Sequence, residues 1–231
     1  MISAFIPLVT FIYGTIFASG IVCTTQRCLT SRPLLVARSC CDHCHHPLTW
    51  WQLWPCIGWL IQHGRCHFCH HPISEHYLLV EILAGSTLAM TVTRQSLPQT
   101  ILTAFFCLGL LALSVQDHHT QAVSASGLTQ LAGLSMTHYL CAQRSWWPLM
   151  LVILGYLLLQ ACCRYWPVIG AGDLDLMVIL WLWFDTTRTL VIIFLACWVF
   201  LLFAWRTASR QHLPFFPALW IGSCLTLMIL P

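Results

Sequence analysis

The chain has 231 residues, of which 58% are hydrophobic and only 7% are charged, and its mean hydropathy is +0.77. Because soluble domains carry about 25% charged residues, this composition excludes an ordinary soluble protein and predicts a polytopic membrane protein. The net charge of +3 comes from ten arginines against seven acidic residues, with no lysine, and this excess is too small to predict a nucleic-acid partner.

The first predicted membrane span covers residues 4–23, an apolar run that is long enough to cross a bilayer. No basic residue precedes it, whereas Arg27, Arg32 and Arg38 follow it, which is the reverse of the charge pattern in a cleavable signal peptide. Because loops rich in arginine stay in the cytoplasm, the N-terminus is predicted to lie outside. We assign residues 1–26 to this first helix.

Residues 27–77 are predicted to form a small cytoplasmic zinc-binding loop domain. Cys41 and Cys44 form one C-x2-C pair, Cys66 and Cys69 form a second, and 21 residues (45–65) separate them. Four thiolates are a preferred ligand set for structural zinc, and the reducing cytoplasm disfavours disulfides. We therefore expect these four cysteines to hold a structural zinc ion. The alternatives are a redox-active thiol pair, incidental thiols without a shared role, or ligation that includes one of Cys40, His45, His46 and His70.

Between the two cysteine pairs, residues 48–61 are apolar and contain four tryptophans. This segment is too short to span a bilayer, so we expect it to lie at the membrane interface. In that position it would hold the metal-binding domain against the bilayer.

Seven further apolar segments are predicted to be membrane helices. They cover about 78–93, 99–116, 121–140, 147–163, 173–185, 188–205 and 213–230. With the first span they predict an all-α polytopic protein of about eight transmembrane helices. The arginines support this count, because seven then lie on the cytoplasmic side and three lie outside, as the positive-inside rule requires. The cytoplasmic set is Arg27, Arg32, Arg38, Arg65, Arg164, Arg206 and Arg210, and the outer set is Arg94, Arg144 and Arg188.

Two acidic residues are placed at the cytoplasmic ends of predicted spans. Asp117 follows the third span, and Asp173 begins the sixth after the turn formed by Gly170 and Gly172. An acid at membrane depth costs about 2.5–3.5 kcal/mol on insertion scales, which makes it a functional candidate. Taken alone, Asp117 could be an interfacial end charge and Asp173 a helix cap.

As a pair, the two carboxylates predict an aspartic peptidase site. Like charges at one site cannot both ionise cheaply, so the pair would hold one proton. One carboxylate would then activate a water molecule while its protonated partner polarises the scissile carbonyl. Gly170 and Gly172, which can adopt positive φ, would leave room for the substrate backbone.

Several motifs in chain order resemble those of bacterial type IV prepilin leader peptidases, which are GxGD aspartic peptidases. The segments that carry the resemblance are Cys41-x-x-Cys44, Trp50-Trp51-Gln52-Leu53-Trp54-Pro55, Gly64-Arg65-Cys66-x-x-Cys69, Pro72-Ile73-Ser74, Val80-Glu81, Leu113-Ser114-Val115-Gln116-Asp117 and Gly170-Ala171-Gly172-Asp173. The compact length, and the absence of lysine after the GxGD aspartate, resemble most the competence-type enzymes of Gram-positive bacteria.

This resemblance implies a membrane endopeptidase that removes the leader of prepilin-like precursors, such as pseudopilins, at the cytoplasmic face of the bacterial cell membrane. Asp117 and Asp173 would be the catalytic residues, within a transmembrane peptidase domain formed by residues 78–231. The implied partners are the precursors and the lipid bilayer. Many members also N-methylate the new N-terminus with S-adenosylmethionine, and we expect this activity here from the resemblance alone.

The sequence departs from the family pattern at three places. Ser124-Ala125 stands where many members have Pro-Asp, Asp175 replaces a common lysine, and Gln52 replaces a frequent loop aspartate. We interpret Asp175 as a partner of the helix dipole in the first turn of its helix, and Asp185 as a solvated loop residue near Arg188.

Two other functions compete with this prediction. A presenilin-type peptidase shares the GxGD chemistry but does not explain the cytoplasmic cysteine pairs. A metal-handling or thiol-redox membrane protein would use the cysteines and histidines without any peptidase activity.

Overall fold

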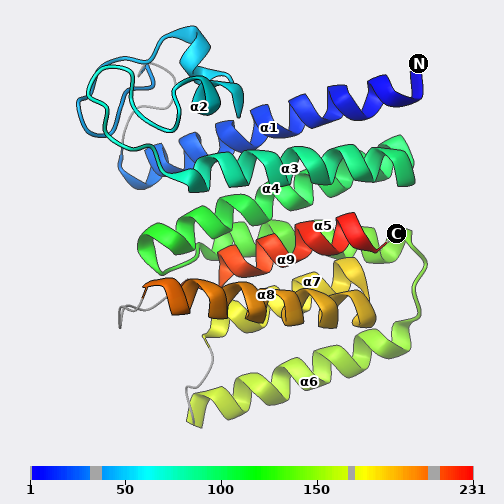
Figure 1. Ribbon diagram of the computed structural model, residues 1–231. Coiled ribbons are helices and arrows are strands. Elements are labelled where there is room, and N and C mark those ends of the chain that lie inside the picture. The colour runs from blue at the N-terminus through cyan, green and yellow to red at the C-terminus, as the bar shows by residue number, and fades with distance from the viewer. Residues whose placement is uncertain (1, 32–37, 166–169, 208–213, 231) are drawn as a thin grey trace. The chain divides into compact units, whose positions relative to one another are not determined.

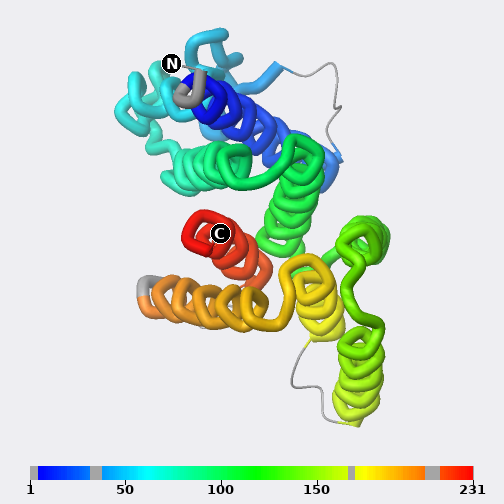
Figure 2. Tube along the Cα trace, turned by 90° about the vertical axis from the view of Figure 1, so that its right-hand side faces the viewer, coloured from blue at the N-terminus to red at the C-terminus, as the bar shows by residue number. Residues whose placement is uncertain are grey.

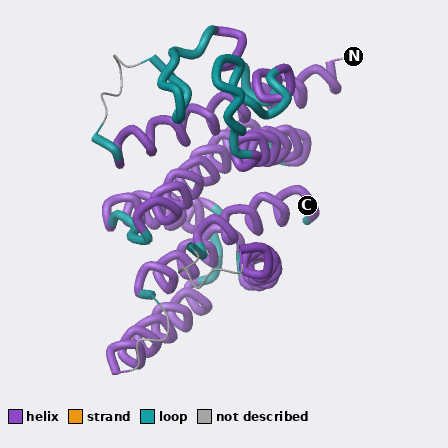
Figure 3. The backbone as a smooth tube through the Cα atoms, turned by 60° about the vertical axis from the view of Figure 1, so that its left-hand side comes forward, coloured by secondary structure: helices purple, strands orange, loops and turns teal. Residues whose placement is uncertain are grey.

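The computed structural model describes residues 2–31, 38–165, 170–207 and 214–230, and within these ranges the chain is helical, without strands (Figures 1 and 3). Arg32 and Arg210, which contribute to the topology prediction, lie outside the described residues. The helices are α1 (Ile2–Leu29), η1 (Trp50–Leu53), α2 (Ile57–Ile61), α3 (Glu75–Arg94), α4 (Leu97–Thr120), α5 (Ala125–Cys141), α6 (Trp146–Tyr165), α7 (Ala171–Phe184), α8 (Thr186–Thr207) and α9 (Phe216–Ile229).

Each of the eight predicted spans coincides with a helix, which confirms the all-α class. Five of the described helices, α1, α3, α4, α6 and α8, are long and apolar enough to cross a bilayer, so the protein is a multi-pass membrane protein. Helices α5 and α7 have 17 and 14 residues. At about 1.5 Å per residue, α7 extends only about 21 Å, less than the roughly 30 Å of a bilayer core. The full count of eight spans therefore stays a prediction.

The chain divides into two compact units, one reaching from the N-terminal helix to Val115 together with Leu227–Ile229, and the other comprising Gln116–Thr226 with Leu230. In the first unit α1 packs closely along α3, as Figures 1 and 2 both show. A Cβ atom on Gly14 would lie 2.8 Å from the Cα of Gly85, and a Cβ on Gly85 would lie 2.7 Å from the Thr15 methyl group. Glycine is therefore required at this crossing, as in other close contacts between membrane helices.

In the second unit α7 is an almost entirely apolar helix with an extensive buried surface. Its apolar residues Leu174, Leu176, Ile179, Leu180, Leu182, Trp183 and Phe184 are all buried. Helix α5 packs against α7, with the ring of His138 stacked on Trp183 at 4.2 Å. The Arg144 guanidinium donates to the last carbonyls of α7, those of Leu182 (3.3 Å) and Trp183 (3.2 Å), which have no partner within the helix. These contacts fix α7, whose first turn carries Asp173.

Candidate active site and metal centre

Asp117 lies in the last turns of α4 and is buried, with 9% of its surface exposed. Its Oδ2 accepts a hydrogen bond from the backbone N–H of Phe216 at 3.2 Å, and the N–H of Phe215 also donates to this carboxylate. Phe216 is the first residue of α9, where backbone N–H groups have no partner within the helix. The start of α9 thus fixes the orientation of the Asp117 carboxylate.

Asp173 lies in the first turn of α7, three residues after the N-cap residue Gly170. The N-cap position is therefore taken by glycine, and this helix start has no side-chain cap, contrary to the alternative of Asp173 as a cap. Gly170 has φ −63°, so the predicted positive φ does not occur at this position. Glycine is useful here because it has no side chain. A Cβ atom at position 170 would lie 3.2 Å from the Oδ2 of Asp173, tighter than ordinary contact, whereas a Cβ at Gly172 would meet only the Phe216 ring at 3.9 Å.

The structure brings the two predicted acids together, since the carboxylates of Asp117 and Asp173 interact electrostatically. They belong to the same compact unit but come from helices that are separated by two others along the chain. Phe216 connects them, because its N–H donates to Asp117 and its ring faces Gly172. No sequence signal indicated Phe216 as part of this site.

Asp175 contacts α6. Its Oδ1 accepts a hydrogen bond from the Tyr156 hydroxyl at 2.5 Å, and that hydroxyl accepts one from Gln160 at 2.5 Å. Asp175 thus connects α7 to α6, in addition to its position in the first turn of a helix. Asp185 accepts a hydrogen bond from the Arg188 backbone N–H at 3.0 Å and caps the start of α8.

The four predicted metal ligands converge. The sulfur atoms of Cys41, Cys44, Cys66 and Cys69 all lie within 4.8 Å of one another, and they form the only such cluster among the described residues. The Cys41–Cys69 and Cys44–Cys66 sulfur distances are 3.9 and 4.0 Å. With zinc–sulfur bonds of about 2.3 Å, a tetrahedral site has sulfur–sulfur distances of about 3.8 Å, so these cysteines fit a zinc ion with four thiolate ligands. The alternative ligand Cys40 and the neighbouring histidines are not part of the cluster.

Each cysteine pair belongs to the same local repeat, C-x-x-C-H-H-P, at 41–47 and again at 66–72. In the first copy Cys41 N–H donates to the His46 carbonyl at 3.0 Å, and in the second Cys66 N–H donates to the His71 carbonyl at 2.9 Å. The fifth residue of each copy, His45 or His70, has positive φ (56° and 55°). These histidines therefore help to form each turn. The repeat is visible in the sequence, but our prediction relied only on the spacing of the cysteines and did not include the histidines.

Backbone N–H groups around Cys66 prepare it for a metal. The N–H of Cys69, and then that of Phe68, donate to the Cys66 sulfur and lower the pKa of this thiol to about 7, although burial opposes the shift. The thiolate is the form that binds metals. These N–H groups therefore favour the thiolate of Cys66.

The chain is similar to one family model and to several known bacterial proteins. The family model for the bacterial peptidase A24 N-terminal domain matches residues 12–95, which include the four cysteines. A prepilin leader peptidase/N-methyltransferase from Neisseria gonorrhoeae is 29% identical over 206 residues, covering 82% of this chain and 70% of that protein. A protein of the same name from Myxococcus xanthus is 29% identical over 180 residues (74% of this chain, 53% of that protein), and one from Aeromonas hydrophila is 44% identical over 52 residues (22% and 18%). No solved structure matches this chain.

Proposed function

We propose that the chain is a member of the peptidase A24 family of bacterial prepilin leader peptidases and that it cleaves the leader from type IV prepilin-like precursors. The observation that carries this proposal is the pairing of Asp117 with Asp173 in the second compact unit. Two carboxylates from distant positions in the chain are the minimum that aspartic peptidase chemistry needs.

In the proposed reaction the two carboxylates share one proton. The ionised carboxylate takes a proton from a water molecule, whose oxygen attacks the carbonyl carbon of the scissile peptide bond. The protonated partner donates a hydrogen bond to the carbonyl oxygen and later gives its proton to the leaving nitrogen as the carbon–nitrogen bond breaks. The N–H of Phe216 keeps Asp117 in position throughout, and the absence of a side chain at Gly170 leaves the Asp173 carboxylate unobstructed.

A structural zinc ion on Cys41, Cys44, Cys66 and Cys69 is part of this proposal. The ion would hold the two C-x-x-C-H-H-P turns together, since the described part of this domain contains only two isolated β-bridges and two short helices. A four-cysteine set leaves no open coordination position for a water molecule, so the metal would stabilise the domain and would not take part in hydrolysis.

We also propose N-methylation of the new N-terminus, with S-adenosylmethionine as the methyl donor, because the relatives carry this activity in their names. Gly170 and Gly172 do not fit a nucleotide-type cofactor, since no strand precedes them in the described chain and the Asp173 carboxylate occupies the space beside Gly170. This second activity therefore rests on the relatives alone.

The proposed location is the bacterial inner membrane, with the carboxylates on the cytoplasmic side, as the arginine distribution predicts. The absence of lysine at position 175 supports a relationship to the competence-type enzymes, and a precursor from a competence system is accordingly one substrate to test.

The test is co-expression with a prepilin-like precursor in cells that lack their own leader peptidase. Intact mass of the precursor should fall by the mass of the leader with the wild-type chain, with a further gain of about 14 Da for a methylated N-terminus. The matched control carries both Asp117→Asn and Asp173→Asn and should leave the precursor uncut. Cleavage of the precursor by this control would show that the proposed activity is wrong. Absence of cleavage by the wild-type chain with every precursor tested would show the same.

A further inference from the structure

The segment between the two cysteine turns, residues 50–61, has its apolar side chains on the outside; we call it the apolar loop. Its exposed residues are Trp50, Leu53, Trp54, Ile57, Leu60 and Ile61, each with between 47% and 70% of its surface exposed. Exposed apolar clusters of this kind mark contact with a membrane or a protein partner.

The polar groups of the apolar loop face inward and satisfy one another. Gln52 is buried, with 7% of its surface exposed, and its Oε1 accepts hydrogen bonds from the Thr49 backbone N–H (2.8 Å) and hydroxyl (2.9 Å). Its Nε2 donates to Gln62 at 3.0 Å, and Gln62 in turn donates to the Gly58 carbonyl at 2.8 Å. In a bilayer, polar groups must be paired within the protein, and the side chains of Gln52 and Gln62 meet that requirement.

A hydrogen bond to α3 sets the depth of the loop. The Oε2 of Glu81 on α3 accepts a bond from the Cys56 backbone N–H at 2.7 Å, and the Ser19 side chain of α1 also bonds to Glu81. Ser19 lies within the apolar span Phe5–Leu29, eight residues before Arg27. At about 1.5 Å per residue, this contact places Cys56 about 12 Å along α1 from Arg27, beside the lipid-facing part of the helix.

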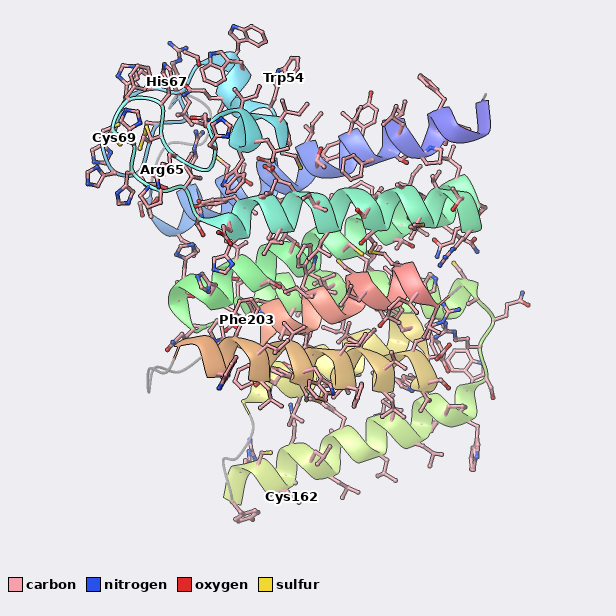
Figure 4. The ribbon with its side chains drawn as sticks, viewed as in Figure 1. Trp54, Arg65, His67, Cys69, Cys162 and Phe203 are labelled. Atoms are coloured by element: carbon pink, nitrogen blue, oxygen red, sulfur yellow. The ribbon has the colours of Figure 1, made fainter. Side chains whose placement is uncertain are left out.

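The side chains follow the same order in Figure 4. Trp54 lies on the side of the loop domain toward the middle of α1, whereas His67 and Cys69 lie on the side toward its C-terminal end. The side chains of Ile16 and Phe17, at the same level of α1, are themselves exposed (46% and 55%), so the loop continues an apolar surface of the helix.

The charges around the apolar loop indicate that the lipids it contacts have anionic headgroups. No acidic residue occurs from 43 to 74, while Arg38 and Arg65 on the two sides of the apolar loop are exposed. A basic rim around an apolar surface matches anionic headgroups above acyl chains. A second copy of the chain would instead bring these basic rims together.

From these contacts we infer that the apolar loop inserts into the adjacent leaflet of an anionic bilayer and seats the metal-binding domain there, with Glu81 as its tether to α1 and α3. This inference does not depend on peptidase activity. It extends the interfacial position expected from sequence to a defined depth, near the level of Ser19.

The experiment places a photo-crosslinking benzoylphenylalanine at Trp54 or at Leu60 in the full chain. The control position is Phe68, an aromatic residue of the second cysteine turn that is 45% exposed. Each metal-loaded protein is reconstituted as a single copy in nanodiscs of phosphatidylglycerol and phosphatidylethanolamine, irradiated and analysed by intact mass.

We expect lipid adducts at Trp54 and Leu60, with phosphatidylglycerol enriched relative to its share of the lipid. At the control position Phe68 we expect no lipid adducts. Equal adducts at all three positions, or none at the first two, would overturn the inference. Crosslinks to a second chain in discs that hold two copies, in place of lipid adducts, would overturn it as well. The two independent positions keep the test decisive if one substitution prevents folding, and bound zinc reports that the domain is intact.

Discussion

Gly170 and Gly172 provide a matched pair of substitutions at the candidate active site. A Cβ atom at position 170 would lie 3.2 Å from Asp173 Oδ2, so the Asp173 carboxylate must move by a few tenths of an ångström in Gly170→Ala. Because a misplacement of 1 Å costs about a hundredfold in rate, a shift of this size should lower kcat by roughly three- to tenfold. Gly172→Ala should change kcat little, since its Cβ would make only an ordinary contact with Phe216 at 3.9 Å.

The assay is cleavage of a purified precursor by each variant in lipid, with kcat and KM determined separately. A fall in kcat at position 170, with bound zinc and thermal stability as in the wild type, would distinguish a displaced carboxylate from poor folding. Full activity of Gly170→Ala, or an equal loss in Gly172→Ala, would refute the reasoning that this glycine leaves room for Asp173.

Three further predictions concern the metal, the helix crossing and the second acid of α7. Cys44→Ser should lose bound zinc and unfold the loop domain, because a structural site contributes about 10–16 kcal/mol in zinc-finger peptides, whereas Cys40→Ser should retain the metal; metal content and protease resistance measure both. Gly85→Leu should lower stability in thermal unfolding by about 1–3 kcal/mol through overpacking, while Gly20→Leu, with no atom within 4 Å of its Cβ position, should be neutral. Asp175→Asn should leave cleavage unchanged, because an amide oxygen also accepts the hydroxyl bond from α6, and a large loss would contradict its role as a helix connection.

Hydropathy predicted the positions of the helices well, because backbone groups in lipid must be satisfied within each segment. Helix α4 illustrates this agreement: the predicted span 99–116 lies within the observed Leu97–Thr120. Hydropathy also gave the short length of α7, since the predicted span 173–185 nearly matches Ala171–Phe184, but it did not show that this helix is buried, because buried apolar helices and lipid-facing ones have the same composition.

The pairing of Asp117 with Asp173 was predictable, because both acids fall at the same end of helices once the spans are counted. The groups that orient these acids were not predictable. Phe216 contributes a backbone N–H, which every residue except proline carries, so its identity gives no signal. The Tyr156 contact with Asp175 depends on how α6 meets α7, and one polar residue in an apolar helix does not reveal its partner.

The sequence also indicated a membrane-associated loop between the cysteine pairs, but not its tether. Glu81 is the seventh residue of α3, and its contact with the Cys56 N–H depends on a backbone turn with φ 58° at Cys56. Such a conformation is uncommon for a residue other than glycine, and composition does not predict it.

The most direct test of the dyad is a double-mutant cycle on precursor cleavage, comparing Asp117→Asn, Asp173→Asn and the double variant as purified, zinc-loaded proteins. Residues that act as one catalytic unit are strongly non-additive, so each single substitution should abolish cleavage to the level of the double variant. Measurable cleavage by either single variant, with a further loss in the double variant, would contradict the claim that these two carboxylates form the catalytic pair.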